Sequence, residues 1–304
     1  MTKKCLLFFS VFALLLTACS QEKGLQYISI YSNVETTEEA NHESEDTLKI
    51  AIASVISPKE SLSKYNMLVT YLEENLGKEI IVIQKQTYDE VIQLLKTGEV
   101  HAAFICSLSY VIGKKENYME GLAAPQADGK NVYQSYIIVR KDSEIENLDD
   151  LADKRFAFMD PYSYSGKLAV LQMLWEAGYN PETFFSETFY TYSHDYSIEA
   201  VQNGVVDGAA VDSIIFDELI KRNIEYYNNL KVIETGPYAG TPPIVVSNKV
   251  SKNLKDNLKS LVLNLHNSQE GKEILDNIGI EKYVPIDEQL YKPIEEIIFL
   301  LGED

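Results

Sequence analysis

The sequence holds few of the residues that build disulfide frameworks or metal centres. Its 304 residues include 3 Cys and 4 His. Cys5 and Cys19 lie within or at the end of an N-terminal apolar run, so Cys106 is alone in the remaining chain and can form no intrachain disulfide. No CxxC pair and no cluster of Cys and His is present. The sequence therefore does not indicate a structural zinc site, and we expect no cofactor.

Positive charge is also scarce. The chain carries 27 Lys and Arg against 46 Asp and Glu, for a formal net charge of -19 at pH 7. Proteins that bind nucleic acid draw much of their affinity from Lys and Arg on phosphates, so we exclude nucleic acid as a partner. The same charge argues against adhesion to an anionic membrane by charge alone. It also repels small anions unless a site supplies its own local donors.

The N-terminal apolar run is too short to span a membrane. It covers residues 5–18, about 14 residues, whereas a membrane-spanning helix needs about 20. Two lysines precede it, which is the pattern of a secretory signal peptide. It ends in Leu16-Thr17-Ala18-Cys19, which resembles the lipobox of bacterial lipoproteins, where cleavage leaves a diacylated Cys. We expect removal of residues 1–18 and stable anchoring through two acyl chains on Cys19; the alternative is an ordinary signal peptide with a chance Cys.

Residues 19–47 are polar and acidic, with 7 acidic residues and a single Lys. This composition is typical of a solvated segment, so we expect a tether between the lipid and the folded chain. The more apolar stretch 25–34 leaves an additional strand open.

From residue 48 onward, strand-like and helix-like segments alternate. A first run has apolar strands at 48–53, 79–84 and 100–105, each followed by a segment with helical spacing. A second run has strands at 155–159, 187–191 and 205–211, with helices at 164–177, 193–203 and 214–222. Alternation with short loops implies parallel pairing and right-handed crossovers. The sequence therefore predicts an α/β protein with two lobes.

Two strands without attached helices connect these runs. Residues 133–140 form a β-rich stretch that leaves the first run, and residues 244–246 form the natural return strand, followed by helices at 251–265 and 289–301. Two crossover strands between lobes make a hinge beside a cleft. We place lobe one at 48–136 plus 242–304, and lobe two at 137–241.

The most informative segment is Asp160-Pro-Tyr-Ser-Tyr-Ser-Gly-Lys167, which follows a predicted strand and opens a helix. Ser163 and Ser165 bring hydroxyls to the positive end of that helix, and Gly166 allows close approach. Such an end binds oxyanions without Lys or Arg. The alternative is that Ser163 or Ser165 only caps the helix.

His194 and Asp212 are further candidates. Ser193 can cap the next helix, which puts His194 in its first turn, where it can donate to an anion although the helix dipole disfavours its protonation. A packed or surface histidine is the alternative. Asp212 ends a predicted strand, at the edge where open α/β sheets bind ligands, whereas Asp207 fits a turn or cap.

An ordered set of motifs between about 48 and 284 resembles the substrate-binding proteins of phosphate, phosphite and phosphonate ABC importers. The matching pieces, in chain order, are Ser57-Pro58, Tyr65, 133–143 (YQSYIIVRKDS), 148–151 (LDDL), 155–158 (RFAF), 160–166 (DPYSYSG), 193–195 (SHD), 200–204 (AVQNG) and 206–207 (VD). The resemblance implies the two-lobed periplasmic-binding-protein fold, type II-like, which agrees with the two lobes predicted from the strand and helix pattern.

The resemblance also implies a ligand site. Ser163, Tyr164 and Ser165 would hold the phosphoryl oxygens, and His194 would complete the cradle. The family often has Thr where this chain has Tyr164, so a small hydroxyl is missing there.

Family members add tyrosines from lobe one and an acid near the second hinge. Tyr65 and Tyr110 are the tyrosine candidates. Residues 236–241 contain no acid, so Asp212 must supply it, and this departure speaks against an aminoalkylphosphonate ligand.

These observations predict a lipid-anchored, monomeric solute-binding protein. It would close around a phosphorus oxyanion or organophosphonate and deliver it to the permease and ATPase of an ABC importer. The alternative is a sensor module that presents a small molecule to a membrane histidine kinase. We do not expect an enzyme, because no Gly-x-Ser-x-Gly elbow, metal-ligand cluster or P-loop is present.

Overall fold

A computed structural model describes residues 47–302 apart from 223. The predicted signal peptide, Cys19, the acidic tether and the open strand at 25–34 lie outside the described residues. The described residues all belong to one compact unit.

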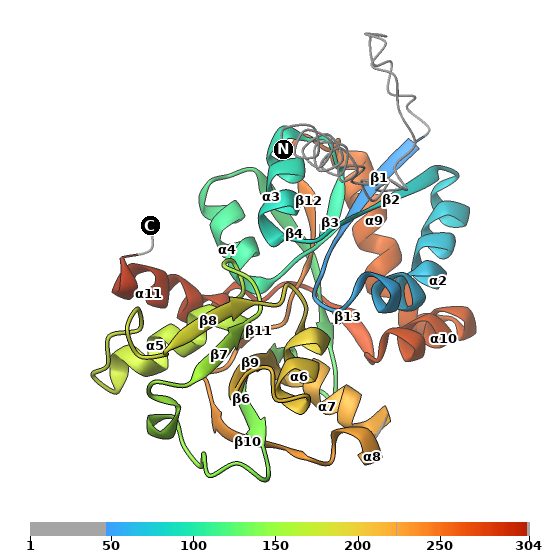
Figure 1. Ribbon diagram of the computed structural model, residues 1–304. Helices are drawn as coiled ribbons and strands as arrows, with labels where there is room; N and C mark the ends of the chain where they lie inside the picture. The colour runs from blue at the N-terminus through green and yellow to red at the C-terminus, as the bar shows by residue number, and fades with distance from the viewer. Residues whose placement is uncertain (1–46, 223, 303–304) are drawn as a thin grey trace, which may run out of the picture. The chain divides into compact units, whose positions relative to one another are not determined.

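One half of this unit is built on a six-stranded sheet in the order β13-β4-β12-β3-β1-β2 (Figure 1). Its strands are β1 (Thr47–Ala53), β2 (Glu79–Lys85), β3 (Ala102–Phe104), β4 (Met119–Gln126), β12 (Ile244–Ser247) and β13 (Lys282–Val284). The strands β2, β1 and β3 are parallel, while β12, β4 and β13 are joined by antiparallel pairing. Its helices are α2 (Pro58–Leu76), α3 (Tyr88–Thr97), α4 (Ser107–Lys115), α9 (Lys252–Asn264), α10 (Gln269–Ile278) and α11 (Lys292–Leu301).

The other half is built on a five-stranded sheet in the order β10-β6-β9-β7-β8. Its strands are β6 (Ser135–Arg140), β7 (Arg155–Phe158), β8 (Glu187–Tyr190), β9 (Gly208–Asp212) and β10 (Leu230–Thr235). The strands β8, β7 and β9 are parallel, and β6 and β10 run antiparallel at the other side. Its helices are α5 (Ala169–Glu176), α6 (His194–Gln202), α7 (Ser213–Arg222) and α8 (Ile224–Tyr227).

Local sequence signals explain where the helices begin and end. Pro58 is the first residue of α2, and Gly77, with φ of 61°, terminates it in the left-handed conformation that favours glycine. A capping box opens α3: the Thr87 side chain accepts from the Glu90 N–H, and the Glu90 carboxylate accepts from the Thr87 N–H. The sequence analysis predicted a helical segment after each of the strands at 48–53 and 79–84, and both helices are confirmed.

The two halves are joined by a small hinge. β5 (Val132–Tyr133) lies between β4 and β6 in the chain, and β11 (Ala239–Gly240) lies between β10 and β12. The two strands pair antiparallel, with Tyr133 opposite Ala239. The prediction of one continuous strand at 133–140 is wrong, because the chain forms two strands, β5 and β6, separated by Gln134. The Gln134 N–H donates to Ser213 Oγ (3.2 Å) and not to a neighbouring strand. The connections otherwise follow the predicted two-crossover arrangement.

Apolar packing continues from one half into the other. One buried cluster includes Val91 of α3, Tyr133 of the hinge, Tyr164 and Leu168 near β7, and Ile294 of α11. Figure 1 shows α11 beside α4 and α5, helices that belong to different halves. The two halves are therefore in close contact, and the ends of their parallel strands face a shared interface.

The sequence reading missed several elements. β4 contains Gly121 and Pro125, both unfavourable in strand interiors, so its sequence does not read as a strand. The helix α10 and the strand β10 were also not predicted. The parallel pairing predicted within each run is confirmed, since β1 pairs parallel with β2 and β3, and β7 pairs parallel with β8 and β9. The connecting strands β6 and β12 pair antiparallel with their neighbours, because a strand that comes from the other lobe enters its sheet in the opposite direction.

Candidate ligand-binding site

The turn after β7 is wider than an α-helical turn. Residues Tyr164–Leu168 form a π-helical turn that leads into α5. Its ring closes where the Leu168 N–H donates to the Ser163 carbonyl oxygen at 3.0 Å. Single π turns are rare in proteins, and those that occur often lie at functional sites. The turn directs the backbone of the predicted oxyanion segment toward the interface between the lobes.

The two serines of this turn have different surroundings. Ser163 Oγ accepts from the Gly166 N–H at 3.0 Å, so Ser163 caps the helix, as the alternative reading held. Ser165 is 1% exposed, and its carbonyl oxygen accepts from Ser135 Oγ at 2.6 Å. No hydrogen bond from the described residues reaches Ser165 Oγ. Ser165 Oγ is not among the fully buried side-chain atoms without a partner in the described residues, so this hydroxyl is free to meet a ligand.

Gly166 is required by the close approach of its neighbours. A Cβ atom at this position would lie 2.4 Å from Met159 Cβ and 3.3 Å from His194 Cε1. Glycine therefore lets the imidazole of His194 lie directly against the turn that carries Ser163 and Ser165. The structure thus brings together four of the residues that the sequence predicted.

His194 begins α6 and is 2% exposed. Its backbone N–H donates to the Val55 carbonyl oxygen (3.0 Å), and its Nδ1 accepts from the Asp212 N–H (3.2 Å). An accepting Nδ1 carries no proton, so the proton of the neutral ring sits on Nε2. Burial lowers the pKa of His194 to about 3, which keeps the ring neutral near pH 7. Nε2–H is therefore a neutral donor, and none of the described residues accepts from it.

Asp212 ends β9 and is 3% exposed. Its Oδ1 accepts from the N–H groups of Ile214 (2.7 Å) and Ile215 (3.2 Å) at the start of α7. Burial raises the pKa of this carboxyl to about 7, although the two backbone hydrogen bonds oppose the shift. Among the described residues no donor reaches Oδ2. Asp212 can therefore act as donor or acceptor near neutral pH.

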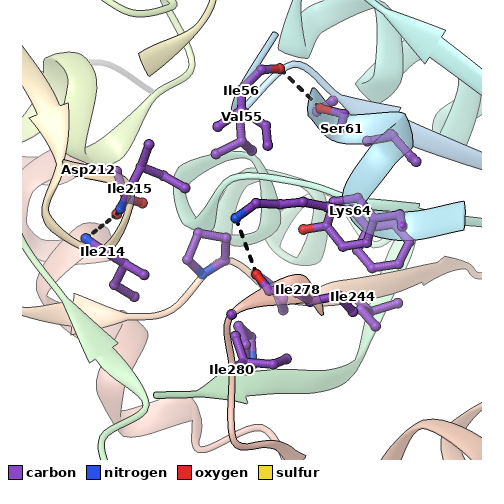
Figure 2. A pocket seen from close by; sticks show the side chains of 18 of the residues that line it. Val55, Ile56, Ser61, Lys64, Asp212, Ile214, Ile215, Ile244, Ile278 and Ile280 are labelled. Atoms are coloured by element: carbon purple, nitrogen blue, oxygen red, sulfur yellow. Dashed lines mark hydrogen bonds between the residues drawn. The ribbon is translucent and has the colours of Figure 1, made fainter. Parts of the chain in front are cut away.

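Asp212 lines a cavity of about 100 Å³ between the two halves. Figure 2 shows its wall, with Lys64 and Ser61 from α2 on one side and Asp212 with its two isoleucines on the other. Tyr65 also lines it, with its ring 4.5 Å from Phe104, and burial raises the pKa of this tyrosine to about 12.

Lys64 also lines the cavity, and the sequence analysis did not predict it. It is 8% exposed, forms an ion pair with Glu218 of α7, and donates to the Ile278 carbonyl oxygen (3.2 Å). Burial lowers the pKa of Lys64, and the nearby Glu218 opposes that shift. A signal was present: Ser61, Lys64, Leu68 and Leu72 are the buried residues of α2 and have helical spacing, so the lysine falls within the apolar stripe.

Two predicted tyrosines have other roles. Tyr110 is not among the residues that line the cavity; its hydroxyl donates to Glu288 Oε1 (2.9 Å), and its ring packs against Tyr291. The Tyr164 hydroxyl donates to the Pro237 carbonyl oxygen (2.7 Å), and its N–H donates to Cys106 Sγ (3.3 Å). The hydroxyl and the backbone N–H of Tyr164 are therefore both occupied within the protein.

Carboxylates of one half bind helix starts of the other. Asp160 accepts from the Tyr88 N–H at the first residue of α3 (3.0 Å), and Asp195 accepts from the Ser57 N–H before α2 (3.0 Å). Negative groups are favourable at such positive helix ends. These contacts hold the lobes together, and the sequence motifs contained both acids without indicating this role.

Within residues 47–302, position 223 aside, no group of three or more His, Cys, Asp or Glu side chains could hold a metal ion. A helix long and apolar enough to cross a membrane is likewise not found in this described part of the chain.

Asp212→Asn is expected to raise the free energy of unfolding by about 4 kcal/mol above pH 7 and to change it little at pH 4. The carboxyl titrates near pH 7 in the folded protein and near 3.9 when unfolded, so its folded-state penalty grows as pH rises between these values. His194 acts in the opposite direction, because its depressed pKa contributes stability that is lost as pH falls below about 6.5. Urea unfolding from pH 4 to 9 measures how the free energy of unfolding depends on pH. If Asp212→Asn showed the same pH dependence as the wild type, the raised pKa of Asp212 would be refuted.

Comparison with known proteins gives consistent results. The model of a family described as "ABC transporter, phosphonate, periplasmic substrate-binding protein" matches residues 50–291. The phosphonates-binding periplasmic protein of Escherichia coli is 27% identical over 260 residues, covering 84% of this chain and 77% of that protein. A phosphate-import protein of Mycolicibacterium smegmatis is 28% identical over 227 residues, covering 71% of each chain.

A solved structure is similar over nearly its whole length. The structure of PhnD1 from Prochlorococcus marinus in complex with methylphosphonate superposes with a TM-score of 0.77 at 23% identity, covering 85% of this chain and 99% of that one. This likeness concerns the fold and includes both lobes.

Proposed function

Because the chain belongs to the phosphonate family of periplasmic substrate-binding proteins of ABC transporters, we propose that it captures a phosphorus oxyanion or organophosphonate between its lobes and delivers it to an ABC importer. The relatives that it resembles include a phosphonates-binding and a phosphate-import protein. The ligand class therefore comprises phosphate, phosphite and phosphonates.

One observation carries this proposal. Ser165 and His194 are buried residues, and none of the hydrogen bonds among the described residues uses Ser165 Oγ or His194 Nε2–H; both residues lie at Gly166, where a side chain would collide with its neighbours. Both donors are neutral, so they provide hydrogen bonds to an oxyanion without a cation. A net charge of -19 does not prevent such binding, because charges beyond about 8 Å are largely screened at physiological salt.

The other predicted residues have supporting roles in the proposal. Ser163 fixes the turn through its cap, and Tyr164 positions that turn through its hydrogen bond to Pro237. Asp212 meets a phosphoryl oxygen through Oδ2, as donor when protonated and as acceptor of a P–OH proton when ionised. Tyr65 closes the lobe-one side of the cavity.

We also propose the setting in which this binding occurs. Cleavage after residue 18 and lipidation of Cys19 would anchor the chain at the outer face of the cell membrane, next to the permease and ATPase. The chain would act there as a monomer and without catalysis. Metabolic labelling with a fatty acid tests the anchor: label is expected in the wild type and absent from Cys19→Ala.

Isothermal titration tests the proposed function. At least one of phosphate, phosphite, methylphosphonate and 2-aminoethylphosphonate is expected to bind the purified chain in a one-to-one complex. Sulfate provides the matched control, because it is an oxyanion of similar shape that carries no proton near pH 7. Absence of heat with all four phosphorus compounds, in a sample whose thermal unfolding is cooperative, would refute the proposal.

A further inference from the structure

The cavity beside Asp212 is apolar over most of its wall. The apolar side chains come from several elements, among them Ile56, Phe104, Ile214, Ile215, Ile244 and Ile280. Figure 2 shows isoleucines on opposite sides of the space. A phosphate or phosphite ion needs hydrogen-bond donors on every side and gains nothing from such a wall.

The charged groups in the wall are largely neutralised by each other. Lys64 and Glu218 form an ion pair, and Arg222 lies 2.5 Å from Glu218 on its other side. Neither charge is therefore available to a ligand without breaking this pair. Asp212 Oδ2 is the one carboxylate oxygen in the wall to which no described residue donates and which is not paired with a cation.

The cavity adjoins one of the proposed oxyanion donors, because two hydrogen-bond partners of His194 line it, although His194 and Ser165 themselves do not. His194 donates its backbone N–H to Val55 and accepts from the Asp212 N–H, and both Val55 and Asp212 line the cavity. His194 therefore links the turn that carries Ser165 to Asp212 and the apolar wall. A group attached to the phosphorus would extend into this space.

We propose that this cavity is a subsite for an apolar organic substituent, so that the protein prefers alkylphosphonates with about four carbons over phosphate and methylphosphonate. The inference rests on the proposed function and specifies its substrate. An apolar cavity of about 150 Å³ accommodates benzene, so a space of about 100 Å³ suits a chain of about four carbons. Each methylene moved out of water favours binding by about fourfold.

A titration series with phosphate, methyl-, n-butyl-, n-octyl- and 2-aminoethylphosphonate tests the preference. We expect n-butylphosphonate to bind at least tenfold more tightly than methylphosphonate, and both the octyl and the aminoethyl compounds to bind more weakly than the butyl compound. Methylphosphonate or phosphate binding as tightly as n-butylphosphonate would overturn the inference and leave the proposed function intact. Silence from the whole series would overturn both.

Substitutions in α7 provide a second, independent test. Ile215 lines the cavity, whereas Ile220 of the same helix packs against another apolar cluster, and both are partly buried. Ile215→Ala is expected to enlarge the space and shift the preferred chain from butyl toward hexyl, while Ile220→Ala keeps the wild-type preference. An Ile215→Ala variant that folds and retains the wild-type preference would overturn the assignment of this subsite.

Discussion

Ser165→Ala is expected to weaken methylphosphonate binding ten- to a hundredfold and to leave the free energy of unfolding nearly unchanged. A hydrogen bond to a charged group contributes about 1.5–3 kcal/mol, which corresponds to this factor. Ser165 is a buried residue whose hydroxyl makes no hydrogen bond among the described residues, so its removal costs the ligand-free protein no hydrogen bond. Titration calorimetry and urea unfolding measure the two quantities.

Ser163→Ala is the matched comparison in the same turn. Its Oγ caps the helix by accepting from the Gly166 N–H, so its loss is expected to lower the free energy of unfolding by about 1 kcal/mol. The two serines therefore differ in the stability measurement. If Ser165→Ala bound methylphosphonate like the wild type, or lost as much stability as Ser163→Ala, Ser165 would be a structural residue and not a ligand donor.

Glu218→Leu is expected to lower the free energy of unfolding by about 3 kcal/mol, because it leaves the buried Lys64 ammonium without its carboxylate. The pair joins α2 of one half to α7 of the other, so the variant is also expected to weaken ligand binding by loosening the contact between the halves. Burial already lowers the pKa of Lys64, and loss of Glu218 removes the charge that opposes this shift. The variant should therefore regain stability as pH rises toward the unfolded pKa of about 10.4.

The double variant Lys64→Met/Glu218→Leu provides the control. Removing both charges leaves no buried ion, so most of the lost stability is expected to return, as in other buried pairs replaced by apolar residues. The four urea-unfolding curves of this cycle at pH 7 measure the coupling. Additive losses in the double variant would show that the pair does not stabilise the contact between the lobes.

The fold was accessible from sequence because its signals are local. Alternating strand-like and helix-like segments predicted the two-lobed α/β fold, and this prediction and the family resemblance are confirmed. The hinge pairing of β5 with β11 joins residues more than a hundred positions apart, and no local pattern indicates it.

The site was only partly predictable for the same reason. A sequence shows that Ser163 and Ser165 stand two residues apart, but the π turn decides that one hydroxyl caps and the other stays without a partner. Lys64 belongs to the buried face of α2, and its spacing from the apolar residues of that face is visible in the sequence. The sequence does not show that this face lies beside the cavity. Tyr110 was predicted to contact the ligand because of its residue type and its place in lobe one. In the structure it does not line the cavity, and its hydroxyl donates to Glu288.

The most direct test of the central claim is a crystal structure of the protein with methylphosphonate. We expect the phosphoryl oxygens between the two lobes, within hydrogen-bond distance of Ser165 Oγ and His194 Nε2, with the methyl group facing the cavity beside Asp212. A ligand bound elsewhere, or one whose phosphoryl group contacts neither Ser165 nor His194, would contradict the account.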